Sequence, residues 1–124
     1  MPLYSRDHTW ISLRGTRARI GISDFAQREL GDIAYVQLPD PGRSLARGEV
    51  ACTVDSLKSS SEIYAPLSGT VVGANAALAS EESCGLINRD PLGEGWLFEL
   101  EPFAQGELDF LLSEEEYAAY IRGA

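Results

Sequence analysis

Short apolar segments separated by turn residues constrain the fold of this chain more than any other feature. Seven such segments alternate with polar stretches, at 10–13, 18–22, 33–38, 50–54, 62–65, 70–74 and 96–101. Short runs at this spacing are typical of antiparallel β proteins of the sandwich or barrel type. Gly15 follows the first segment, and the Pro39–Gly42 stretch follows the third, where both predict turns. We therefore expect a mainly β fold.

Two segments have the pattern of short helices. In the stretch 23–31, Asp24 followed three residues later by Gln27 predicts a capping box, and Gly31 supplies a stop. In the stretch 113–123, Ser113 and Glu116 form the same pattern before Gly123.

The expected C-terminal helix has one apolar face. Tyr117, Tyr120 and Ile121 fall at positions i, i+3 and i+4, so they share that face and are expected to pack on the sheets. We interpret the tyrosines as core residues rather than as a binding surface.

Length and charge limit the classes of function. A chain of 124 residues is expected to form one domain, spanning 1–124. Nineteen acidic against ten basic residues give a net charge of −9, which disfavours binding to nucleic acid or to an anionic membrane surface. The expected partners are proteins with basic surfaces.

The N-terminus and the cysteines indicate a cytoplasmic protein. The first residues have no apolar leader segment, so we expect a reducing compartment in which Cys52 and Cys84 stay thiols. Cys52 lies in a strand pattern and is interpreted as core, and Cys84 as a small buried residue, with thiol exchange as the alternative. With a single histidine, His8, no metal site is expected.

Lys58 is the only lysine in the chain, whereas the other nine basic residues are arginines. A salt bridge can use arginine equally well, but only a lysine amine can lose its proton and be acylated. Lys58 lies in the polar stretch 56–61 between two apolar segments, so it is predicted at the tip of a β-hairpin. Such a tip is exposed and narrow enough to enter the cleft of an enzyme.

The stretch "GRSLARGEVACTVDSLKSSSEIYAPLSGTV" resembles the attachment region of lipoyl and biotinyl carriers, with Gly42, Gly48 and Gly69 at its turns. Beyond it, the chain resembles the family of glycine cleavage system H proteins. The resemblance also rests on "HTW", "GISDFAQRELGDIAYVQLPDPG", "GLINRDPLGEGW" and the acidic C-terminal helix. It implies a lipoyl-domain-like barrel-sandwich hybrid with short helices and a C-terminal helix.

The same resemblance implies a function. Lipoic acid would be amide-linked to Lys58 by a lipoate ligase or lipoyl transferase; biotin is disfavoured because Leu57 and Ser59 replace its usual flanking methionines. The arm would carry aminomethyl groups from glycine decarboxylase to aminomethyltransferase, and dihydrolipoyl dehydrogenase would reoxidise it. The chain would be a non-catalytic carrier, since the cofactor supplies the chemistry. We also expect a monomer.

In such carriers the loaded arm folds into a groove on the protein. The resemblance places His8, Thr9, Glu62 and Asn88 in that groove, with Asp7 close by. Family members have a glutamate where this chain has Thr9, and that glutamate can hold the aminomethyl amine by a charge-assisted hydrogen bond. Thr9 offers no charge.

This departure leaves a second hypothesis open. Relatives of the H protein carry lipoate for a heterodisulfide-reductase-like system of sulfur oxidation, and a sulfur cargo would not need the amine-binding carboxylate. A third hypothesis is a non-lipoylated β domain that serves only as an interaction module. An autonomous enzyme is disfavoured, because no nucleophile stands in a recognisable relation to His8.

Overall fold

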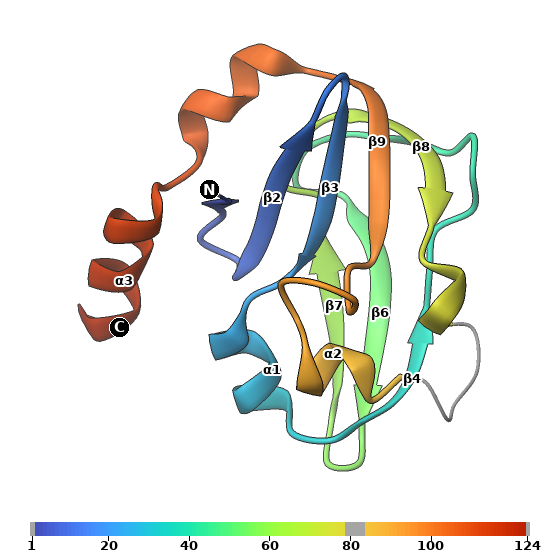
Figure 1. Cartoon of the computed structure of the whole chain (residues 1–124), viewed down its shortest axis with the longest axis vertical. Coiled ribbons are helices and arrows are strands. Elements are labelled where there is room, and N and C mark those ends of the chain that lie inside the picture. The colour runs from blue at the N-terminus through green and yellow to red at the C-terminus, as the bar shows by residue number, and fades with distance from the viewer. Residues whose placement is uncertain (1, 79–83, 124) are drawn as a thin grey trace.

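The computed structural model describes residues 2–78 and 84–123, which form two antiparallel sheets (Figure 1). The larger sheet has the strand order β1-β2-β3-β9-β8-β5, and the smaller one the order β4-β6-β7. The strands are β1 (Leu3–Tyr4), β2 (Thr9–Arg14), β3 (Arg17–Ile22), β4 (Ile33–Gln37), β5 (Ser44–Leu45), β6 (Val50–Ser56), β7 (Ser60–Tyr64), β8 (Gly69–Ala74) and β9 (Phe98–Phe103). The mainly β prediction is confirmed.

Each of the seven predicted strands is present, with its ends moved by up to two residues. The two that the sequence did not show are β1 and β5, which have two residues each. Two residues cannot display an alternation of apolar and polar side chains, so pairing with a neighbouring strand defines them.

The first helix, α1 (Asp24–Leu30), has a different cap from the predicted one. Ser23 is the N-cap: its backbone is extended and its Oγ accepts a hydrogen bond from Ala26 N at 3.1 Å. Asp24 already lies inside the helix, where its carboxylate accepts from the Gln27 side chain at 2.9 Å. The capping-box prediction was therefore wrong by one residue, because both residue types at 23 and 24 can cap a helix.

The C-terminal helix, α3 (Glu114–Gly123), has the predicted capping box. Ser113 Oγ accepts from Glu116 N at 3.2 Å, and Ser113 N donates to the Glu116 carboxylate at 2.9 Å. Shorter elements that the sequence did not predict are α2 (Leu86–Arg89) and two 3₁₀ segments, η1 (Ala76–Leu78) and η2 (Gln105–Phe110).

One apolar core is shared by the two sheets. Val54 and Ile63 of the small sheet and Ile20 and Leu100 of the large sheet are buried in it. Each buried side chain of this size stabilises the fold by roughly 1.5–3 kcal/mol. Cys52 belongs to this core, as predicted, and burial raises the pKa of its thiol to about 12.

Cys84 is also buried in that core, with 1% of its surface exposed, and its Sγ lies 3.6 Å from Leu78 O. The interpretation as a buried apolar residue is confirmed. Because the thiol is out of reach from the surface, the structure gives no support to exchange with an external disulfide.

A second apolar cluster docks α3 against the N-terminal strands, which Figure 1 shows beside it. Tyr117 is buried and stacks on Tyr4, with ring centroids 4.2 Å apart. Ile121 packs at the edge of the cluster, whereas Tyr120 is exposed, so the interpretation as core residues is confirmed for Tyr117 and wrong for Tyr120. The predicted apolar face of α3 thus contacts β1 mainly through one of its two tyrosines.

Three glycines lie before and after the β6–β7 hairpin. Gly42 and Gly48 have φ values of 92° and 89°, which side-chain-bearing residues seldom adopt, and both turns were predicted. Gly69 is required by space instead, since a Cβ there would lie 2.6 Å from Pro102 O. In the described ranges, no helix is long and apolar enough to cross a membrane.

Candidate functional site

Lys58 lies at the exposed tip of the β6–β7 hairpin, as predicted. The turn is shaped by Ser56, whose N donates to Ser59 O at 2.8 Å and whose Oγ accepts from the backbone N of Lys58 and Ser59. The serines near the lysine therefore do more than leave space around it. Ser56 forms local hydrogen bonds with Lys58 and Ser59 in place of the pairing between β6 and β7, and these bonds close the tip.

The tip rests on the segment that joins α1 to β4. Leu57 N donates to Asp32 O at 3.0 Å, and the Lys58 side chain lies over Gly31. A Cβ on Gly31 would stand 3.3 Å from Lys58 Cε, closer than most van der Waals contacts. Gly31, which the sequence identified only as a helix stop, thus also provides a path for the lysine.

Asn88, predicted to line the arm groove, supports this segment from below instead. Its Oδ1 accepts from Ile33 N at 2.9 Å, and its Nδ2 donates to Gly31 O at 2.8 Å and to Gln27 Oε1 at 3.0 Å. These contacts occupy the Asn88 amide and fix the turn between α1 and β4. Asn88 does not line the groove described below, and it bonds instead to Gly31, over which the Lys58 side chain lies.

Beside the tip, a groove of about 160 Å³ runs between α1 and β7. Its floor is apolar, and the floor residues are Ile22, Phe25, Ala26, Leu30 and Ile63. Its rim carries three exposed carboxylates, those of Asp7, Glu29 and Glu62, together with Ser61 and the ring of His8.

Sequence reasoning placed His8 and Glu62 in this groove and Asp7 near it, but it missed Glu29. The helical pattern of α1 could have shown Glu29, because it lies one helical turn after Phe25 and Ala26 on the same side of the helix. Within the described residues, no three His, Cys, Asp or Glu side chains converge to hold a metal ion.

His8 is held tightly at one end of the groove. Its Nδ1 lies 2.7 Å from the hydroxyl of Tyr117, and its ring packs against Phe25 at a centroid distance of 4.7 Å. Burial lowers the pKa of His8, while the negative charges of Asp7 and Glu29 offset part of that effect. The neutral imidazole is thus the favoured form at pH 7.

Thr9 lies outside the groove, contrary to the sequence-based expectation. Its side chain is fully buried, and its Oγ1 is 2.6 Å from Ser5 Oγ. The pairing of β2 with β3 places Thr9 opposite Ile22, and the hydroxyl pairs with Ser5 because a buried polar group needs a partner. Thr9 therefore stabilises the β1–β2 connection rather than contacting a ligand.

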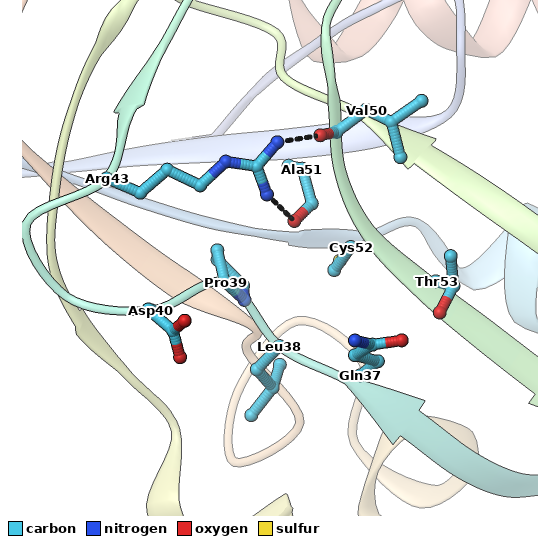
Figure 2. A pocket seen from close by; sticks show the side chains of 9 residues that line it. All are labelled: Gln37, Leu38, Pro39, Asp40, Arg43, Val50, Ala51, Cys52 and Thr53. Atoms are coloured by element: carbon cyan, nitrogen blue, oxygen red, sulfur yellow. Dashed lines mark hydrogen bonds between the residues drawn. The ribbon is translucent and has the colours of Figure 1, made fainter.

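A larger cavity, of about 270 Å³, lies at the other end of β6, far along the strand from Lys58 (Figure 2). There the Arg43 guanidinium donates to Val50 O at 2.8 Å and to Ala51 O at 3.4 Å. The Cys52 thiol at this cavity stays protonated at neutral pH because burial raises its pKa to about 12. No sequence-predicted site residue lines this cavity.

Comparison with known proteins identifies the family of the chain. The family model for the glycine cleavage H-protein matches residues 2–124. The chain is 44% identical to the glycine cleavage system H protein of Thermotoga maritima, over 97% of this chain and 95% of the relative. It is 46% identical to that of Thermus thermophilus, over 92% and 88%.

A solved structure agrees as well. The crystal structure of a glycine cleavage system H protein from Mycobacterium marinum superposes with a TM-score of 0.83 and 34% identity, covering 99% of this chain and 97% of that one. The chain belongs to the glycine cleavage H-protein family. Members of this family carry lipoic acid on a lysine and catalyse no reaction themselves.

The residues of this chain fit such a group. Lys58 is exposed at a narrow tip, and its side chain passes over a glycine whose missing Cβ leaves it room. The groove that begins beside it has an apolar floor, which suits a hydrocarbon chain and a dithiolane ring.

Proposed function

We propose that this chain is a lipoyl carrier of the glycine cleavage system, in which an arm attached to Lys58 shuttles aminomethyl groups between enzymes. The observation that carries the proposal is the position of the only lysine, at an exposed hairpin tip beside an apolar groove with a rim of carboxylates. When bound, lipoic acid supplies the disulfide and dithiol chemistry, so the protein presents and shelters the arm.

The charges of the groove favour a cationic cargo. Acylation of Lys58 removes its positive charge, which leaves Asp7, Glu29 and Glu62 around a neutral His8. A protonated amine would be attracted by such a rim, whereas an anionic sulfur species would be repelled. Because the carboxylates are exposed, salt screens part of this effect.

The sulfur-oxidation alternative loses its main support. Its argument was that Thr9 removes the groove's carboxylate, but Thr9 does not line the groove, and three other carboxylates do. The curated relatives with 44% and 46% identity are glycine cleavage system H proteins, which also favours the aminomethyl cargo. The hypothesis of an unmodified interaction module has no observation in its favour.

The proposed partners follow from this function. A lipoate ligase or lipoyl transferase modifies Lys58, and glycine decarboxylase, aminomethyltransferase and dihydrolipoyl dehydrogenase receive the arm. The net charge of −9 favours docking on basic surfaces of these enzymes. We further propose that the chain works as a single-domain, monomeric protein in the cytoplasm.

The test compares the two cargoes on the same lipoylated protein. With a glycine decarboxylase, we expect robust exchange of glycine carboxyl with bicarbonate. With a sulfurtransferase and a reduced arm, we expect no sulfur adduct in the intact mass. Sulfur loading without exchange activity would contradict the proposed function.

A further inference from the structure

The backbone of His8 has φ +69°, in the left-handed region that residues other than glycine seldom adopt. Two backbone hydrogen bonds hold it there: His8 N donates to Ser5 O at 3.2 Å, and Ser23 N donates to His8 O at 2.9 Å. Such conformations persist only where the surroundings fix them, and they cluster at functional sites. His8 also lines the groove, so the fixed backbone conformation lies at that site.

A chain of hydrogen bonds connects the His8 ring with both α1 and α3. Ala26 N donates to Ser23 Oγ at 3.1 Å, Ser23 Oγ lies 2.7 Å from the Tyr117 hydroxyl, and that hydroxyl lies 2.7 Å from His8 Nδ1. Ser23 is 1% exposed and Tyr117 is 5% exposed, so water does not compete for these groups.

The donors and acceptors in this series of hydrogen bonds can be assigned, because each hydroxyl has one hydrogen to donate. Among the hydrogen bonds of the described residues, Tyr117 is the only partner that can accept from the Ser23 hydroxyl, so Ser23 donates to Tyr117. The only other partner of the Tyr117 hydroxyl there is His8 Nδ1, so Tyr117 donates its own hydrogen to that nitrogen. The reverse direction would leave the buried Ser23 hydrogen without an acceptor, which is costly. His8 then carries its proton on Nε2.

We propose that Tyr117 is a positioning residue of the groove: its hydroxyl, oriented by Ser23, holds the His8 ring against Phe25 as the neutral Nε2–H tautomer. Since His8 and Phe25 both line the groove, the C-terminal helix sets the shape and the hydrogen-bonding character of the groove end. The tautomer and the ring position stand on the structure alone. Only their consequence for the cargo rests on the proposed function.

The experiment compares Tyr117→Phe with Tyr120→Phe as the matched control. The first variant removes the hydroxyl and keeps the ring that stacks on Tyr4, whereas the second removes an exposed hydroxyl, on the same helix, that contacts Arg6 O at 3.3 Å. His8 is the only histidine, so its imidazole ¹⁵N resonances in the unmodified protein need no assignment by mutation.

In the wild-type protein we expect the Nε2–H tautomer to dominate. Tyr117→Phe should reduce the ratio of Nε2–H to Nδ1–H about three- to tenfold, as loss of one hydrogen bond predicts, and Tyr120→Phe should leave it unchanged. A wild-type Nδ1–H tautomer, or equal ratios in the three proteins, would overturn the proposal. Should Tyr117→Phe fail to fold, the wild-type tautomer alone decides.

The direction in which the pKa of His8 changes provides a second test of which group donates. A donor to the neutral ring lowers the pKa, so Tyr117→Phe should raise it, whereas an accepting hydroxyl would make it fall. Because Asp7, Glu29 and Glu62 at the rim and the nearby Tyr120 are unchanged in Tyr117→Phe, they cannot produce the difference. A fall of the pKa in Tyr117→Phe would contradict the assigned direction.

The last comparison concerns the cargo. On lipoylated, aminomethyl-loaded protein, Tyr117→Phe should lose the aminomethyl group faster than the wild type and Tyr120→Phe. Equal rates in the three proteins would overturn the link between Tyr117 and the groove. A protein that is never lipoylated would defeat the proposed function and leave the tautomer result standing.

Discussion

The hairpin tip and the groove beside it are built from different kinds of contact. The tip is closed by hydrogen bonds that Ser56 Oγ accepts from the backbone N of Lys58 and Ser59, two and three positions away. The end of the groove is held by His8 and Ser23, whose contacts with Tyr117 join residues 109 and 94 positions apart. The turn at the tip is therefore closed by local contacts, although Leu57 N also donates to Asp32 O, whereas the end of the groove depends on the packing of α1, α3 and the β1–β2 connection.

This difference separates two roles. A local turn keeps its conformation when distant contacts change, so the attachment of an arm should be robust. A groove made of distant segments is sensitive to each of them, so shelter for the cargo should be the first property to fail. The predictions below test that division, beginning with the largest effect.

Replacement of Lys58 by arginine should abolish lipoylation completely, because no other lysine exists in the chain. Intact mass after coexpression with a lipoate ligase should show one lipoyl increment on the wild type and none on Lys58→Arg. The melting temperature should stay the same, since changes at exposed positions usually alter stability by less than about 0.5 kcal/mol. An increment that survives the substitution would sink the assignment of Lys58.

Two glycine variants test the contact between the Lys58 side chain at the tip and Gly31 at the end of α1. Gly31 and Gly42 both have positive φ, but only Gly31 faces the Lys58 side chain. Gly31→Ala and Gly42→Ala should each lower the free energy of unfolding by about 1–3 kcal/mol, because alanine is strained there. Denaturant titrations measure this cost.

The same pair reports on the lysine. Only Gly31→Ala should shift the NMR resonances of the Lys58 side chain, which are unique because the chain has one lysine. If Gly42→Ala moves them equally, the contact between Lys58 and Gly31 has no influence in solution.

Two N-cap serines distinguish the buried network from an ordinary cap. Ser113 caps α3 at the surface, while Ser23 caps α1 in a buried position and also contacts Tyr117. We expect Ser113→Ala to cost about 1 kcal/mol and Ser23→Ala about 2 kcal/mol, since the second also removes a buried hydrogen bond. Equal costs in thermal or denaturant unfolding would show that the Ser23–Tyr117 contact adds nothing to stability.

The smallest effect concerns pH. Burial lowers the pKa of His8 below its value in the unfolded chain, so the unfolded state binds the proton more readily. The stabilising contribution of neutral His8 is complete above the unfolded value of about 6.5 and is lost as the pH falls toward the folded value. Asn tolerates positive φ, so His8→Asn is a suitable reference.

The measurement is the free energy of unfolding of both proteins at several pH values. The wild type should lose more stability than His8→Asn as the pH falls below 6.5, although the carboxylates titrate in both. Parallel curves would mean that His8 has the same pKa in the folded and unfolded states.

Much of the fold could be predicted because its signals are local. Alternating apolar residues revealed the long strands, and Gly42 and Gly48 marked turns that the structure confirms. The cap of α1 was misplaced by one residue because Ser23 and Asp24 are both good caps, and only the packed structure distinguishes them.

The groove was predicted less well. His8 and Glu62 line it, but Thr9 and Asn88 do not, and Glu29 was missed. Family resemblance transfers positions and cannot show where a different side chain turns. Thr9 pairs with Ser5 in the interior, and the Asn88 amide forms hydrogen bonds with Gly31 and Ile33 in the turn next to Lys58.

The sequence by itself determined the seven longer strands, the hairpin and the single acylatable amine, since each depends on residues that are neighbours along the chain. Only the tertiary structure decided which groups surround the groove and how His8 is held. Those features depend on contacts between segments up to 109 positions apart, and such contacts form only when the shared core and the α3 cluster bring the segments together.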